Sequence, residues 1–121
     1  MNRHDRGRSG EDLAWDHLRR AGYELIERNA RSRLGEIDLV VERQGTVVFV
    51  EVRSRTSARF GTPFESVDAR KQRRLGRLAV AYLGRRRLQD RRARFDVIAV
   101  EWQDGAPKID HLENAFELAG C

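Results

Sequence analysis

Two neighbouring apolar segments carry charged residues inside what otherwise look like core strands. The segments are EIDLVVER, residues 36–43, and TVVFVEV, residues 46–52, and Gln44-Gly45 joins them. A charged group in a protein core costs on the order of several kcal/mol unless it is paired or bound to a metal. The fold must therefore give these charges a partner, a ligand or a proton.

A two-residue turn at Gln44-Gly45 determines which residues of the two segments oppose each other. One face then pairs apolar residues only: Ile37 with Val52, Leu39 with Val50 and Val41 with Val48. The other face pairs Val40 with Phe49, Asp38 with Glu51, and Glu36 with Arg53. A shift by one residue would mix charge into the apolar face, which supports this register.

The opposition of Asp38 and Glu51 needs an explanation, because like charges directly across a sheet are destabilising. Either one carboxyl is protonated or a cation lies between them. Carboxylate oxygens without cysteine or a nearby histidine favour magnesium or manganese over zinc. The only cysteine is Cys121, and the three histidines, His4, His17 and His111, show no mutual ligand spacing and are expected in surface or packing roles. We therefore expect Mg²⁺ or Mn²⁺ as the cofactor.

The rest of the chain predicts an α/β domain. Helical spacing of apolar residues predicts helices over residues 10–21, with Ser9 as N-cap, and 66–84, with Ser66 as N-cap. Strands are expected from Tyr23, over 94–102 and over 107–112, and a loop over 54–63. Helix, three strands, helix and strand in this order favour helices covering both faces of a mixed sheet. Residues 1–8 are expected to form a flexible basic arm and residues 9–121 a single domain.

Glu11 and Lys71 each lie on the apolar side of a predicted helix, close to its first turn. Both are expected to point toward the sheet, near Asp38 and Glu51. For Glu11 the alternative is a favourable charge in the first helical turn, and for Lys71 it is a side chain whose ammonium reaches solvent. Asp96, which interrupts an apolar strand, is expected to anchor an arginine or a backbone group.

The net charge of +5 suggests a polyanionic partner. All but two of the 24 basic residues are arginine, a bias that either phosphate binding or a GC-rich coding sequence would produce. No segment reaches the roughly 20 apolar residues of a membrane span, and the first residues lack the apolar stretch of a secretory signal. We therefore expect a cytoplasmic protein without a membrane partner. The sequence leaves the oligomeric state open, a homodimer included.

The spacing of the charged residues resembles a nuclease signature. Asp38, followed after twelve residues by Glu51-Val52-Arg53, resembles the PD-(D/E)XK pattern of restriction-endonuclease-like proteins. From Gly10 to Phe116 the chain resembles the YraN family of small bacterial proteins in an ordered set of motifs: GEDLAWDHLRRAGYELIERNAR, GEIDLV, VFVEVRSR, FG, VDARKQRRLGRLAVAYL and RFDVIAV. The resemblance implies a three-layer restriction-endonuclease-like core (αβββαβ) with a mixed central sheet, a divalent metal, and similarity to archaeal Holliday-junction resolvases.

The resemblance also implies roles for individual residues. Asp38 and Glu51 would be the metal carboxylates, the Val52 carbonyl a further ligand, and Glu11 would complete the site directly or through water. Arg53 stands where the signature has lysine. Because arginine stays protonated it cannot act as a base, but it can hold a phosphate or stabilise developing negative charge. Lys71 would supply the ammonium instead.

These inferences predict a metal-dependent endonuclease-like protein that binds DNA, branched or structured DNA included, and hydrolyses phosphodiesters. Its catalytic residues would be Asp38, Glu51, Arg53 and Lys71. The residues expected to contact nucleic acid are Arg55, Arg73, Arg74 and Arg77. The alternative is a catalytically weak nucleic-acid-binding or protein-interaction module that retains the nuclease fold.

Overall fold

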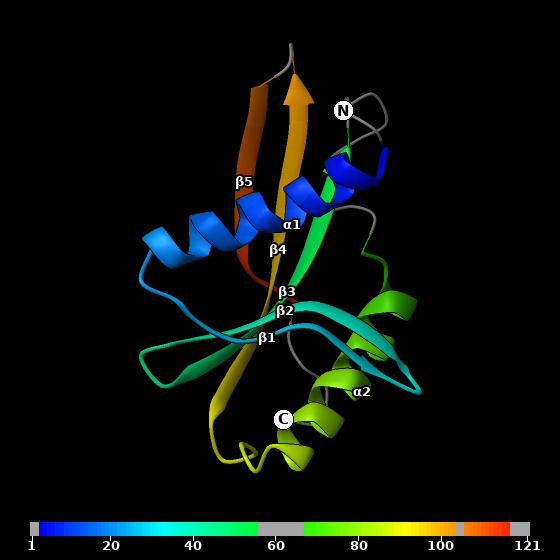
Figure 1. Cartoon of the computed structure of the whole chain (residues 1–121). Coiled ribbons are helices and arrows are strands. Elements are labelled where there is room, and N and C mark those ends of the chain that lie inside the picture. Colours follow the sequence, from blue (N-terminus) through cyan, green and yellow to red (C-terminus); the bar gives the residue numbers. More distant parts are fainter. Residues whose placement is uncertain (1–2, 56–66, 104–105, 117–121) are drawn as a thin grey trace.

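The computed structural model describes residues 3–55, 67–103 and 106–116, except for the side chains of residues 3–9, 55 and 103. The predictions for residues 56–66, which include Ser66 as an N-cap, lie outside this part of the chain. Two helices and five strands follow one another along the chain (Figure 1): α1 (Arg3–Arg20), β1 (Glu24–Ser32), β2 (Gly35–Arg43), β3 (Thr46–Arg55), α2 (Ala69–Arg85), β4 (Arg92–Gln103) and β5 (Ala106–Phe116).

The five strands form one mixed sheet in the order β1-β2-β3-β4-β5. The pair β3 and β4 is parallel and is connected through α2, whereas the other neighbouring strands are antiparallel. The chain thus follows the αβββαβ order of a restriction-endonuclease-like core, with β5 added at one edge. The predicted fold class is confirmed.

The helices cover opposite faces of the sheet, as their places in Figure 1 indicate. Phe49 of β3 packs into an apolar cluster with α2, while its neighbour Val50 packs into a second cluster with α1. Because successive side chains of a strand point to opposite faces, β3 is buried on both sides. This places the middle of the three-layer sandwich at β3, one residue from Glu51.

The hairpin between β2 and β3 has the predicted register over most of its length. Gln44 and Gly45 both have positive φ, 51° and 80°, as the predicted tight two-residue turn requires. The pairs Leu39–Val50 and Val41–Val48 are those expected from the sequence.

The predicted register does not continue to the end of the hairpin. The paired residues run from Arg43–Thr46 only as far as Leu39–Val50. Beyond this point Ile37 packs in the cluster with α2, whereas Val52 packs on the cluster with α1, so the expected Ile37–Val52 pair is wrong. The direct oppositions that we expected for Asp38–Glu51 and Glu36–Arg53 likewise lie past the last recorded pair. There the Asp38 side chain accepts the Val52 N–H.

The helix boundaries differ from the expected ones at both N-termini. The first helix begins at Arg3 rather than after Ser9, so most of the expected flexible arm is helical. Arginine has a high helix propensity and no proline interrupts the segment, which explains the extension. Asp68 caps α2, because its side chain accepts a hydrogen bond from the Lys71 N–H. Neither α1 nor α2 has the length and apolar character of a membrane-crossing helix.

Candidate functional site

Asp38 lies in β2 at the point where β2 and β3 stop pairing. Its Oδ2 atom accepts a hydrogen bond from the Val52 N–H of β3 at 2.8 Å. Burial, and next the nearby charge of Glu51, raise the pKa of the Asp38 carboxyl from 3.8 to about 7. The Val52 N–H opposes this rise because it stabilises the carboxylate. The carboxyl is therefore poised between its protonated and ionised forms near neutral pH.

Glu51 lies on β3, on the face that carries α2, and is 8% exposed. Its Oε1 atom lies 3.0 Å from Lys71 Nζ and 3.6 Å from a terminal nitrogen of Arg53. Burial raises the pKa of Glu51, while the charges of Arg53 and Arg74 oppose that rise. Burial therefore makes ionisation of both Asp38 and Glu51 less favourable than in water.

Lys71 is placed at the site by the start of α2. Its backbone N–H donates to Asp68 Oδ1 at 2.9 Å, and its ammonium donates to Glu51. A cation near a helix N-terminus meets the positive end of the helix dipole, which is unfavourable. The Glu51 carboxylate offsets this cost, and the predicted approach of Lys71 to the sheet is confirmed.

Glu11 approaches the site from α1 but has its own partners. Its Oε1 atom lies 3.7 Å from a terminal nitrogen of Arg28. The Asn29 amide nitrogen, in the orientation that satisfies its neighbours, donates to Glu11 at 3.3 Å and to Glu36 at 2.8 Å. The charge of Glu11 contributes to the raised pKa of Asp38, so the two side chains are within electrostatic reach.

Arg53 extends from β3 beside Glu51. Its Nε atom is buried and has no hydrogen-bond partner among the residues that the structure describes. Glu36, which the predicted register placed opposite Arg53, instead pairs with Arg31 at 3.0 Å. A buried donor without an acceptor costs roughly 1–3 kcal/mol. Arg53 therefore has a hydrogen-bond donor that the described residues do not satisfy.

The donor chemistry of the site fits a hard divalent cation. Asp38 and Glu51 supply carboxylate oxygens, and the Val52 backbone adds a carbonyl of the kind that magnesium and manganese accept. Within the described part of the chain, no group of three or more His, Cys, Asp or Glu side chains is arranged to hold a metal. Glu11 is turned to Arg28, so a cation here would rest on two carboxylates, with water in its remaining positions.

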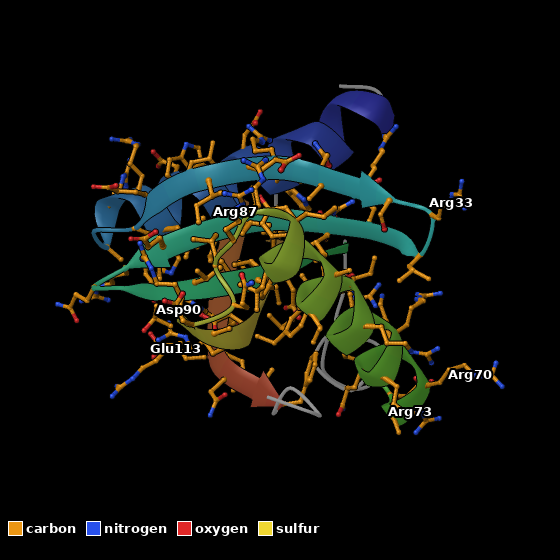
Figure 2. The ribbon with its side chains drawn as sticks, turned by 90° about the horizontal axis from the view of Figure 1, so that it is seen from below. Arg33, Arg70, Arg73, Arg87, Asp90 and Glu113 are labelled. Carbon is orange, nitrogen blue, oxygen red and sulfur yellow. The ribbon has the colours of Figure 1, made fainter. Side chains whose placement is uncertain are left out.

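Exposed arginines lie beside the carboxylates along α2. Arg73, Arg74 and Arg77 all face solvent, as does Arg70. Arg70 and Arg73 project from α2 on the same side of the molecule as Arg33 of the β1–β2 turn (Figure 2). The charge of Arg74 opposes the burial-driven rise in the pKa of Glu51, which links this surface to the site. Of Arg55, only the backbone in β3 is described.

Sequence reasoning missed a polar network on the α1 side of the sheet. Asp96 is fully buried, and its carboxylate accepts hydrogen bonds from Arg94 at 3.0 and 3.1 Å, from His111 at 2.7 Å and from the Asn114 N–H at 3.0 Å. His111 also lies 3.1 Å from His17. The expectation that Asp96 anchors an arginine or backbone group is confirmed. No sequence signal joins His17 to His111, since 94 residues separate them.

Comparisons with known proteins identify similar chains. Residues 10–100 match the model of a family described as "Uncharacterised protein family UPF0102". A UPF0102 protein of Moorella thermoacetica is 50% identical over 113 residues, and the alignment covers 93% of each chain. A UPF0102 protein of Trichlorobacter lovleyi is 49% identical over 115 residues, which cover 93% of this chain and 91% of that relative.

Among solved structures, Pyrococcus furiosus SfsA in complex with Ca²⁺ matches with a TM-score of 0.41 and 13% sequence identity. The match covers 93% of this chain and 64% of that chain, less than two thirds of its length.

Proposed function

Because the chain belongs to the UPF0102 family, which is the YraN family that its motifs resemble, we propose that it is a metal-dependent DNA endonuclease. Its substrates would be structured or branched DNA, and its reaction the hydrolysis of a phosphodiester in the cytoplasm, where bacterial DNA lies. The observation that carries this proposal is that the half-buried Asp38 lies within electrostatic reach of the buried Glu51, and that Lys71 and Arg53 approach Glu51.

The electrostatics of the carboxylates support a cation site. Burial is the largest cause that raises the pKa values of both Asp38 and Glu51, so the ionised form of each carboxyl is less favourable here than in water. A divalent cation would offset this cost because it stabilises the ionised forms. Such a cation, when bound, supplies an activated water and neutralises phosphate charge.

The cationic side chains would bind and orient the substrate. Among the described residues the Arg53 Nε donor has no partner, and a movement of the side chain would let it hydrogen-bond a phosphate oxygen. Lys71 supplies a compact ammonium, which stabilises negative charge that develops on the phosphate during hydrolysis. Asp38 and Glu51 would hold the cation, and the Val52 carbonyl would add a neutral oxygen.

The exposed arginines of α2 would hold the nucleic-acid backbone. Arg73 and Arg77, four residues apart, share one face of α2, and Arg74, three residues from both Lys71 and Arg77, lies between that face and Lys71. Contacts to phosphates position a nucleic acid without reading its sequence. We therefore expect affinity that depends on DNA shape and salt more than on sequence.

Cleavage of defined DNA structures tests the proposal. Purified protein would be incubated with single-stranded, duplex, flap and four-way-junction DNA in magnesium, manganese or EDTA, alongside Asp38→Asn. Metal-dependent cleavage that is lost in Asp38→Asn supports the endonuclease. Equal products from both proteins would indicate a contaminating nuclease.

A second candidate function is DNA binding without efficient cleavage. Arg53 occupies the position of the signature lysine, and Lys71 is engaged with Glu51, two features that favour a weakened catalyst. Steeply salt-dependent DNA binding with no cleavage in any metal would select this alternative.

A further inference from the structure

The Lys71 ammonium forms an ion pair with Glu51, a carboxylate that a bound metal would also need. Lys71 Nζ lies 3.0 Å from Glu51 Oε1, and the two side chains are 20% and 10% exposed. Arg53 lies farther from the same oxygen, at 3.6 Å. Lys71 therefore makes the closest cationic contact to Glu51, while the charges of Arg53 and Arg74 also act on this carboxylate.

We propose that Lys71 is an exchangeable counter-cation: it holds Glu51 in the metal-free protein and is released toward the substrate phosphate when a divalent cation binds. This inference rests on the proposed function, because it assumes a divalent cation at Asp38 and Glu51. It goes further in assigning one side chain two successive partners, first a carboxylate and then a phosphate.

Competition for Glu51 follows from charge. A divalent cation on this carboxylate would lie close to the ammonium, and like charges in a partly buried site repel strongly. The ammonium can leave because lysine has a long, flexible side chain, and its backbone stays fixed by the hydrogen bond to Asp68. Lys71 can therefore move its charge without any change in α2.

The direction of that movement is toward the exposed arginines. Arg74, three residues after Lys71 on the same helix, is its neighbour on the surface of α2, and the charge of Arg74 reaches Glu51. An ammonium released from Glu51 adds to the positive surface that would hold a phosphate. Metal and nucleic acid would then each strengthen the binding of the other, because such coupling is reciprocal.

The first test measures metal affinity by calorimetry with Mn²⁺ and Mg²⁺. Lys71→Met, which keeps an unbranched side chain but removes the charge, is expected to bind metal about tenfold more tightly than wild type, a typical size for coupling between sites. Arg74→Gln removes a charge that acts on Glu51 without a hydrogen bond, and is expected to change affinity less than about threefold because exposed charges are screened.

The second test follows Lys71 itself. The chain contains only two lysines, Lys71 and Lys108, and Lys108 is exposed on β5. Reaction with an amine-specific acylating reagent, read by peptide mass spectrometry, should be slow at Lys71 without metal and faster at saturating Mn²⁺. Lys108 should react at the same rate in both conditions.

The outcomes separate this inference from the proposed function. Tighter metal binding by Lys71→Met together with metal-enhanced acylation of Lys71 supports the exchange. If Mn²⁺ binds wild type and Lys71→Met equally, or leaves Lys71 acylation unchanged, the exchange is overturned while the metal site stands. If no variant binds either metal, both the exchange and the proposed metal centre are overturned.

Discussion

The Asp38 carboxylate accepts the Val52 N–H at 2.8 Å, just beyond the last pair of the β2–β3 ladder, Leu39–Val50. A side-chain oxygen thus satisfies a strand N–H that backbone pairing leaves free. This contact holds Asp38 next to the strand that bears Glu51, although the two residues are not ladder partners. The hydrogen bond from Val52 to Asp38 therefore lies both at the end of the β2–β3 ladder and at the candidate site.

The first prediction concerns stability and pH. Because the folded protein raises the pKa of Asp38 from 3.8 to about 7, it binds this proton more tightly than the unfolded chain does. The resulting stability is complete below pH 3.8 and is lost as the pH rises through 7. Asp38→Asn keeps an oxygen that can accept from Val52, so it should stabilise the metal-free protein by about 1–4 kcal/mol at pH 7.5.

Urea unfolding at several pH values without metal measures this difference. The gain from Asp38→Asn should be small at pH 4 and largest above pH 7. Magnesium or manganese should raise the melting temperature of the wild type and not that of the variant. An equal metal response in the two proteins would count against a site at Asp38.

The second prediction concerns the Asp96 network. Although burial opposes ionisation, hydrogen bonds from His111 and Arg94 hold the pKa of Asp96 below its ordinary value. Asp96→Ala leaves the Arg94 charge without this partner, and breaking a buried ion pair costs about 3–5 kcal/mol. This contribution is present above pH 3.8 and is lost as the pH falls below the lowered pKa.

Urea unfolding at neutral pH checks the prediction, with Asp110→Ala as the control. Asp110 is an exposed acid on β5, so its removal should change the free energy of unfolding by less than about 0.5 kcal/mol. Similar losses in both variants would mean that Asp96 does not anchor β4 to β5.

Local sequence patterns predicted those parts of the molecule that depend on turn type, strand alternation and helical spacing. The turn at Gln44-Gly45 and the alternation of apolar residues were enough to predict the register from Val41–Val48 to Leu39–Val50, and to identify Asp38 and Glu51 as unusual. The approach of Lys71 to the sheet followed from helical spacing alone. Each of these inferences depends on residues close together in the sequence.

The remaining features depend on contacts that no local pattern specifies. Where the β2–β3 ladder ends, the Asp38 side chain accepts the Val52 N–H in place of a backbone carbonyl. Glu36 forms an ion pair with Arg31 of β1 rather than with Arg53. The contact of His17 with His111 arises only when α1 packs on the sheet. Periodicity indicates which face a residue occupies, but it does not identify its partner on another element.

The third prediction concerns nucleic-acid binding by α2. Replacing Arg73 and Arg77 together by glutamine should weaken binding to all DNA structures to a similar extent, because phosphate contacts carry no sequence information. The slope of log affinity against log salt should fall by about two, roughly one for each lost phosphate contact. Fluorescence anisotropy at several salt concentrations measures both effects.

Arg20→Gln provides the control for this experiment. Arg20 is exposed at the end of α1, on the other face of the sheet, and pairs with Asp16 at 3.0 Å. Its loss should leave the salt slope unchanged. An equal decrease for Arg20→Gln would mean that the effect reflects net charge rather than a binding surface on α2.

The fourth prediction compares the two cations that flank Glu51. Lys71 makes the closer contact, 3.0 Å against 3.6 Å for Arg53, so we expect Lys71 to supply the catalytic ammonium. Lys71→Ala should then lower the cleavage rate by about 100-fold or more, the usual cost of losing a group that stabilises developing charge. Arg53→Lys should change the rate little, because it retains a positive charge at that position.

Cleavage of the best DNA substrate in saturating metal measures both variants, with Lys108→Ala as a control for the loss of an exposed lysine. Both changes leave the apolar faces of β3 and α2 intact, so circular dichroism should be unchanged. The opposite result, faster cleavage by Arg53→Lys and only weaker binding by Lys71→Ala, would make Arg53 the limiting residue. If every variant and the wild type bind DNA equally with a steep salt dependence and none cleaves it, the chain is a DNA-binding module, because the carboxylates then serve no hydrolytic step.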